Sequence, residues 1–190
     1  INKRWMYEES MRMPFLVRYP DMVESGSVTD ELINNTDFAP TMIELAGGEV
    51  PDYMQGRSFK EVLETGEEPA DWRESTYYRY WMHMAHKHAN PAHFGIRTHD
   101  KKLIFYYGKY YQEGNRDSWG NRFDFETPPG WEFYDLEKDP FEMDNRYDEP
   151  EYQTTIQEMK KKLKSVRERL NETDEEYPEI QQVIQENWED

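Results

Sequence analysis

The most constraining feature of this sequence is a regular apolar stripe near its carboxyl end. From Pro150 onward, apolar residues recur at spacings of 4, 3, 4, 3 and 4, and they are Tyr152, Ile156, Met159, Leu163, Val166 and Leu170. This spacing places them on one face of an α-helix, and that face needs a partner surface. We therefore predict a helix over residues 150–170 that docks on a sheet. A coiled coil is the alternative, but it normally needs a longer repeat.

Four shorter runs upstream of this helix favour β-strands, because they are rich in aromatic residues and are bounded by turn residues. They are Ser75–Trp81, Phe94–Thr98, Leu103–Tyr107 and Glu132–Leu136. The second and third flank a short turn at residues 99–101, so they are expected to form a hairpin. The short links predict a small antiparallel sheet with one covered face.

The amino-terminal residues favour a short helix followed by a strand. Residues 5–11 can form about two helical turns, in which Glu8 and Arg12 stand at the i,i+4 spacing of an ion pair. The run Phe15–Tyr19 lies between two prolines and predicts a mostly buried strand. A second helix should then begin after an N-cap at Thr36 or Asp37 and end at Gly47 in the left-handed conformation.

Composition limits the partners of the chain. Forty acidic residues against 23 basic ones give a formal charge of -17, which repels phosphate backbones, so we expect no nucleic-acid partner. No apolar run is long enough to span a membrane, so we expect no membrane partner. There are no cysteines, which excludes disulfides and thiolate metal sites. The last residues, 171–190, contain acids but no Lys or Arg, and they predict an acidic tail with one short helical piece.

All five histidines fall between positions 83 and 99. Neutral imidazoles could bind a metal ion, and protonated ones could hold an anionic substrate. The stretch "HMAHKH" nevertheless lacks a complete ligand set, and it favours a loop that lines a polar cleft over a metal site. A merely solvated loop is the third possibility.

Four stretches, taken together, resemble one family. "KRWMYEESMRMPFLVRYP" is similar to the run that follows the metal-binding segment in type I sulfatases of the alkaline-phosphatase superfamily. "NNTDFAPTMIELAGGEVPDYMQGRSF" resembles the family's Asp-x-x-Pro-Thr helix and Gln-Gly-x-Ser loop. "HFGIRTHDKKLIFYYG" and "FYDLEKDPFEMDN" are similar to its carboxy-terminal hairpin and the turn after it. The four matches occur in family order from Lys3 to Asn145.

This resemblance implies an α+β chain with two structural parts. Residues 1–70 would form the carboxy-terminal edge of a large α/β sulfatase domain. Residues 71–170 would form the small antiparallel-sheet subdomain with its packed helix, followed by the acidic tail. The resemblance also implies a protein that works in the periplasm or outside the cell.

The implied chemistry is hydrolysis of sulfate esters, with a sulfated carbohydrate or a small sulfate ester as the expected substrate. The family uses a formylglycine nucleophile and a calcium ion, and this chain has neither the nucleophile motif nor the metal ligands. They would belong to an amino-terminal catalytic half, so this piece should be inactive alone. Lys3 matches the family lysine that contacts the sulfate, where an ammonium can neutralise developing negative charge. Glu8 and Arg12 match positions that we interpret as a helix-anchoring pair.

The family's carboxy-terminal subdomain also closes over the cleft and helps to select the substrate. His93, which directly precedes "FGIRT", is the first candidate for a substrate contact, with His86 and His83 behind it. Arg97 could touch an anionic sugar, although an Arg within a hairpin more often forms an ion pair on the sheet. Two other readings stay open: a phosphoester or phosphonoester hydrolase of the same superfamily, and a non-catalytic module that binds carbohydrate or protein.

Overall fold

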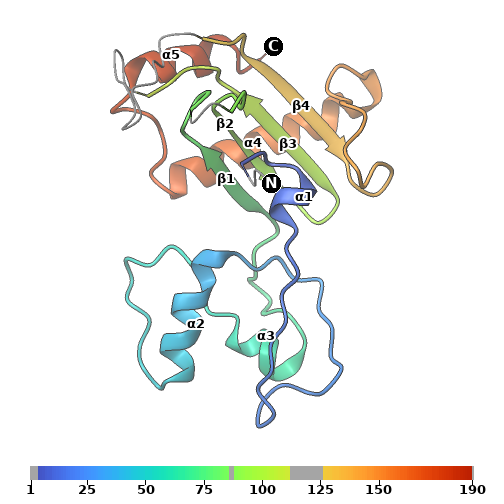
Figure 1. Cartoon of the computed structure of the whole chain (residues 1–190), viewed down its shortest axis with the longest axis vertical. Helices are drawn as coiled ribbons and strands as arrows, with labels where there is room; N and C mark the ends of the chain where they lie inside the picture. Colours follow the sequence, from blue (N-terminus) through green and yellow to red (C-terminus); the bar gives the residue numbers. More distant parts are fainter. Residues whose placement is uncertain (1–3, 86–87, 112–125, 190) are drawn as a thin grey trace. The chain divides into compact units, whose positions relative to one another are not determined.

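The computed structural model describes residues 4–85, 88–111 and 126–189, and they form two compact units (Figure 1). One unit combines the residues up to Met13 with Tyr77–Asp190, and the other is Pro14–Thr76. The first residues of the chain therefore group with the sheet and not with residues 14–70. The assignment of residues 1–70 to the edge of a larger α/β domain stays a prediction.

The sheet has four strands in the order β1-β2-β3-β4, and their bounds are β1 Thr76–Tyr80, β2 His93–Arg97, β3 Lys101–Tyr106 and β4 Gly130–Asp135. Strands β2 and β3 pair antiparallel and form the predicted hairpin, with Gly95 opposite Ile104. Strands β3 and β4 are also antiparallel. The predicted α+β class and the small antiparallel sheet are confirmed.

Both faces of the sheet are covered, whereas the sequence analysis predicted one covered face. Alternate residues of β3 point to opposite sides: Leu103 and Phe105 belong to one core cluster, and Ile104 and Tyr106 belong to another. The first cluster contains the apolar stripe of α4 (Gln153–Arg169), which runs behind the sheet in Figure 1. The second contains Met6 from the amino-terminal segment. A continuous apolar run such as that of β3 is typical of a strand buried on two sides.

The predicted helix over residues 150–170 is confirmed as a 3₁₀ turn, η2 (Pro150–Tyr152), followed by α4. The residues predicted to be an acidic tail contain a second helix, α5 (Pro178–Glu186), which matches the expected short helical piece. It is not merely solvated, because Ile180 and Ile184 are buried in the main core. The Trp131 indole N–H also donates to the Asn187 carbonyl over 2.9 Å, which ties the end of the chain to β4.

The other unit contains three short helical elements, η1 (Asn35–Asp37), α2 (Phe38–Leu45) and α3 (Lys60–Thr65). Asp37 lies directly before α2, and Gly47 follows it with a φ of 79°, as predicted. A small core of Phe59, Val62 and Trp72 holds this unit together.

Two predictions near the amino terminus are wrong. The run Phe15–Tyr19 forms no strand, and Leu16 is 94% exposed. A strand needs a neighbour for its backbone groups, and residues 14–75, all of which the structure describes, contain no other strand. The two helical turns expected over residues 5–11 are reduced to α1 (Glu8–Met11).

Among the described residues, no helix has the length and apolar character needed to cross a membrane.

Candidate functional site

The amino-terminal segment, defined here as Arg4–Met11, lies against the sheet and is held there by side chains from three strands. Met6 is fully buried above Gly95 of β2, and a Cβ atom at Gly95 would stand only 2.6 Å from the Met6 sulfur. The Tyr78 hydroxyl of β1 donates to the Arg4 carbonyl over 2.9 Å. A glycine is therefore needed at position 95 so that this segment can approach the sheet.

His93 lies beneath this segment in an aromatic enclosure. Its ring stacks on Trp5 with 6.0 Å between centroids, and Tyr78, Tyr80 and Tyr106 surround it at 5.1–5.7 Å. The side chain is completely buried, and Nδ1 lies 2.8 Å from the Pro91 carbonyl oxygen. Nδ1 is therefore the protonated nitrogen of a neutral ring, and Nε2 has no hydrogen-bond partner among the described residues.

Burial lowers the pKa of His93 to about 4, because desolvation disfavours the charged imidazolium. A neutral, enclosed ring of this kind supports packing of the amino-terminal segment. The ring has no exposed surface, and a substrate contact from His93 stays a prediction.

Two other described histidines, His83 and His99, lie at opposite ends of β2. His83 is also fully buried, and its Nδ1 accepts a hydrogen bond of 3.1 Å from the backbone N–H of Ala92, directly before β2. His99 is exposed at the hairpin turn, at the far end of β2. Lys3 and His86, predicted to contact the sulfate and the substrate, both lie outside the described residues. The structure thus brings His83 and His93 to one strand end but buries both.

Two tyrosine hydroxyls that share one glutamate continue the contact between the segment and the sheet. The Tyr7 and Tyr106 hydroxyls both donate to Glu132 of β4, over 2.9 and 3.0 Å. Burial raises the pKa of Tyr7 to about 12; the hydrogen bond with the Tyr106 hydroxyl opposes this rise, and the Glu132 charge adds to it. Burial and the Glu132 charge also raise the pKa of Tyr106. Both tyrosines are therefore neutral donors at physiological pH.

An ion cluster completes the contact, and we define it as Glu8, Arg97, Lys102 and Glu142. The Glu8 carboxylate receives two hydrogen bonds from Arg97, of 3.1 and 3.0 Å, and lies 2.9 Å from the Lys102 ammonium. Burial opposes ionisation of Glu8, but the two cations outweigh it and lower its pKa to about 2. The expected Glu8–Arg12 pair is wrong: Arg12 is exposed, and residues far along the chain supply the partners of Glu8.

The comparisons with known proteins agree with this architecture. A model of the family described as "N-sulphoglucosamine sulphohydrolase, C-terminal" matches residues 1–118 and 122–169. The chain belongs to this family. It is thus a carboxy-terminal portion of a sulfatase of the alkaline-phosphatase superfamily, as the resemblance implied.

This sulfatase portion is similar in sequence and structure to proteins that are named for a sulfatase activity. It is 40% identical over 177 residues, 93% of its length, to an N-acetylglucosamine-6-O-sulfatase of Bacteroides thetaiotaomicron. It is 28% identical over 160 residues to an arylsulfatase of Clostridium perfringens. A structure solved in complex with its substrate, D-glucosamine-2-N,6-O-disulfate, matches 90% of the chain with a TM-score of 0.76 and 38% identity. The chain spans only 27%, 28% and 31% of these three proteins.

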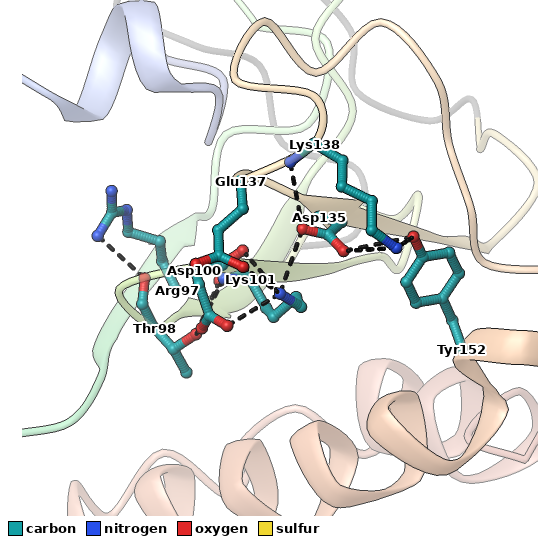
Figure 2. A network of polar contacts seen from close by, with 8 residues as sticks. All are labelled: Arg97, Thr98, Asp100, Lys101, Asp135, Glu137, Lys138 and Tyr152. Atoms are coloured by element: carbon teal, nitrogen blue, oxygen red, sulfur yellow. Dashed lines mark hydrogen bonds and ion pairs between the residues drawn. The ribbon is translucent and has the colours of Figure 1, made fainter.

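The matched motif at residues 133–145, which forms the end of β4 and the turn after it, has a structural role. Figure 2 shows Lys101 between Asp100, Asp135 and Glu137, with Nζ–O distances of 2.9, 3.2 and 4.0 Å. The Asp135 carboxylate also accepts a hydrogen bond of 3.3 Å from the hydroxyl of Tyr152, which lies directly before α4. This network joins the hairpin to the turn after β4.

A buried aspartate, Asp37, holds together the matched motif at residues 34–59. Asp37 is fully buried and accepts hydrogen bonds from the backbone N–H groups of Asn34 and Arg57, at 2.7 and 2.8 Å. Its carboxylate also forms a bidentate pair with Arg73. The Gln-Gly-x-Ser loop packs so closely that a Cβ at Gly56 would overlap the Thr36 carbonyl. These contacts stabilise the fold of this unit. They occupy both carboxylate oxygens of Asp37, which indicates a structural role for this residue.

The described residues contain no group of three or more His, Cys, Asp or Glu side chains placed to hold a metal ion. The sequence also has no cysteine for conversion to formylglycine. The described residues thus offer no calcium site of this kind, and calcium and formylglycine stay predictions about the remainder of a full-length protein.

Proposed function

We propose that the full-length protein containing this chain is a sulfatase that removes sulfate from a sulfated amino sugar, with N-acetylglucosamine 6-sulfate as the first substrate to test. The observation that carries this proposal is the 40% identity, over nearly the whole chain, to a relative named N-acetylglucosamine-6-O-sulfatase. The similar structure whose title names a disulfated glucosamine as its substrate supports the same class.

Within that protein, this chain would contribute Lys3 as a contact to the sulfate group. An ammonium is a compact positive charge, which stabilises negative charge that develops on the ester oxygen as the bond breaks. Formylglycine, held with calcium in the rest of the protein, would supply the nucleophile. The chain alone would lack turnover for that reason.

The histidines would contribute in different ways. His83 and His93 have no exposed surface, so in this conformation they would shape the strand end beneath the amino-terminal segment. His93, then His86 and His83, stay the predicted substrate contacts. We also propose that the protein acts in the periplasm or outside the cell, where sulfated carbohydrates are met; fractionation of the native cells tests this, and a purely cytoplasmic signal would contradict it.

The decisive experiment uses the complete reading frame that contains this chain. We expect the purified protein to release sulfate from N-acetylglucosamine 6-sulfate, and to release little phosphate from N-acetylglucosamine 6-phosphate. Both products are measured by ion chromatography. Preferential phosphate release would favour the phosphoester alternative. Binding of the sulfated sugar without any product, after formylglycine has been verified by mass spectrometry, would favour a non-catalytic module.

A further inference from the structure

The hairpin carries two cations that face each other. Arg97 of β2 and Lys102 of β3 are direct partners in the antiparallel register. Their side chains are 17% and 0% exposed, so solvent screens them little. Like charges directly opposite each other destabilise a sheet pair. The hairpin therefore needs negative charge from elsewhere in the protein.

Two glutamates from outside the hairpin supply that charge. Glu8 bridges the two cations, and Glu142, from the turn after β4, lies 2.5 Å from the Lys102 ammonium. Glu142 also accepts a hydrogen bond of 2.6 Å from the backbone N–H of Glu8. Burial raises the pKa of Glu142, against the opposing attraction of Lys102. With all four groups ionised, the cluster is electrically neutral.

The backbone conformation of Glu142 indicates that its contacts hold this residue in a less favourable conformation. Its φ is 54°, in the left-handed region that non-glycine residues adopt infrequently. This conformation places the Glu142 carboxylate where it meets both Lys102 and the start of α1.

Helix α1 depends on these contacts for its position. It has four residues, none of them buried, and its N-cap Tyr7 makes no side-chain capping bond. Helices this short are not stable by themselves in water. Buried ion pairs add little net stability compared with apolar side chains, but they can specify one arrangement. The ion cluster is therefore suited to fixing where the amino-terminal segment lies on the sheet.

We propose that Glu8, Arg97 and Lys102 are positioning residues that hold the amino-terminal segment in place for Lys3, five residues before Glu8 in the sequence. This inference rests on the proposed function, in which Lys3 contacts the sulfate. The residues between them are anchored as well, through the Arg4 carbonyl and the Trp5 ring. A displacement of about 1 Å at a catalytic group can reduce turnover about 100-fold.

The test replaces Glu8 in the full-length protein and measures steady-state desulfation of N-acetylglucosamine 6-sulfate. Glu8→Gln keeps the shape of the side chain but removes the charge that bridges Arg97 and Lys102. We expect kcat to fall about 10- to 100-fold, with a much smaller change in KM, because the lysine is misplaced without loss of the sugar contacts. Glu9→Gln is the matched control, since Glu9 is exposed beside Glu8 and undergoes the same chemical change. Equal kcat values for Glu8→Gln and the wild type would overturn the proposal.

Hydrogen exchange separates positioning from general stability. We expect peptides covering residues 4–13 to exchange faster in Glu8→Gln, while peptides from β2 and β3 keep their protection and Glu9→Gln behaves as the wild type. Equal loss of protection in the sheet peptides would indicate a merely structural cluster and would overturn the proposal. If Glu8→Gln does not fold, Arg97→Lys serves instead, because it keeps the charge but loses the bidentate geometry.

This exchange measurement does not require activity. A wild-type protein that releases no sulfate would refute the proposed function and, with it, the link to Lys3. The exchange pattern would still decide whether the ion cluster holds the amino-terminal segment.

Discussion

Acid should loosen the contact between the amino-terminal segment and the sheet through one residue, His93. The imidazole is fully buried, and its pKa lies at about 4 instead of the ordinary 6.5. The groups that face it are the rings of Trp5, Tyr78, Tyr80 and Tyr106, with Arg4 beyond Tyr80. No carboxylate among the described residues bonds to Nε2 to compensate a positive ring.

The size and sign of the effect follow from these values. The unfolded chain binds a proton at His93 below pH 6.5, and the folded protein does so only below about pH 4. Stability is therefore complete above pH 6.5 and falls as the pH drops towards 4, where the loss levels off. The interval between the two pKa values corresponds to about 3 kcal/mol.

The assay is urea unfolding of the wild type and of His93→Phe, at steps between pH 7.5 and 4. The phenyl ring keeps the aromatic packing and cannot titrate, and any packing cost of the larger ring is the same at each pH. Titrations elsewhere in the protein cancel in the difference between the two curves. We expect the wild type to lose about 3 kcal/mol relative to the variant over this range. Parallel curves would refute a buried neutral His93.

Three further substitutions test the packing that the structure shows. Gly95→Ala should destabilise the sheet unit by about 1–3 kcal/mol or more, because its Cβ would press on Met6 and on the Leu103 carbonyl; differential scanning calorimetry would measure the loss, and an unchanged Tm would contradict the close approach. Leu163→Ala should cost about 2–5 kcal/mol by opening a cavity under the sheet, measured by denaturant unfolding; a cost near zero would mean that α4 is not docked there. Asp37→Ala should cost about 3–5 kcal/mol, because Arg73 would be left buried without its carboxylate; limited proteolysis should then cut within residues 14–76, and wild-type resistance would count against this role.

Regular patterns made the sheet and its helix predictable. The apolar stripe of residues 150–170 repeats with helical period over about five turns, which favours a helix docked on the sheet over a coiled coil. The hairpin was equally clear, because two apolar runs flank a short polar turn. Such signals are local, so the sequence carries them without knowledge of tertiary contacts.

Contacts between distant residues were not predictable from those patterns. Glu8 has an ideal local partner in Arg12, but the buried cations Arg97 and Lys102 outcompete it, since screening by water weakens the exposed pair. The histidine count suggested a polar loop, whereas His93 serves as an aromatic core residue. One signal was available: opposed Arg97 and Lys102 within a predicted hairpin imply a carboxylate partner from outside it.

The strand predicted at Phe15–Tyr19 was wrong because the long-range contact that it needs is missing. Its composition fits a buried strand, but pairing depends on a second strand that residues 14–75 do not supply. Local preference alone therefore could not fix its state.

The most direct test of the central claim is the turnover of Lys3→Ala in the full-length protein with N-acetylglucosamine 6-sulfate. The account predicts that the wild type releases sulfate and that kcat of the variant falls about 100- to 1,000-fold, as on loss of one donor to a developing oxyanion, with an unchanged Tm. A variant that desulfates the sugar at the wild-type rate would contradict it.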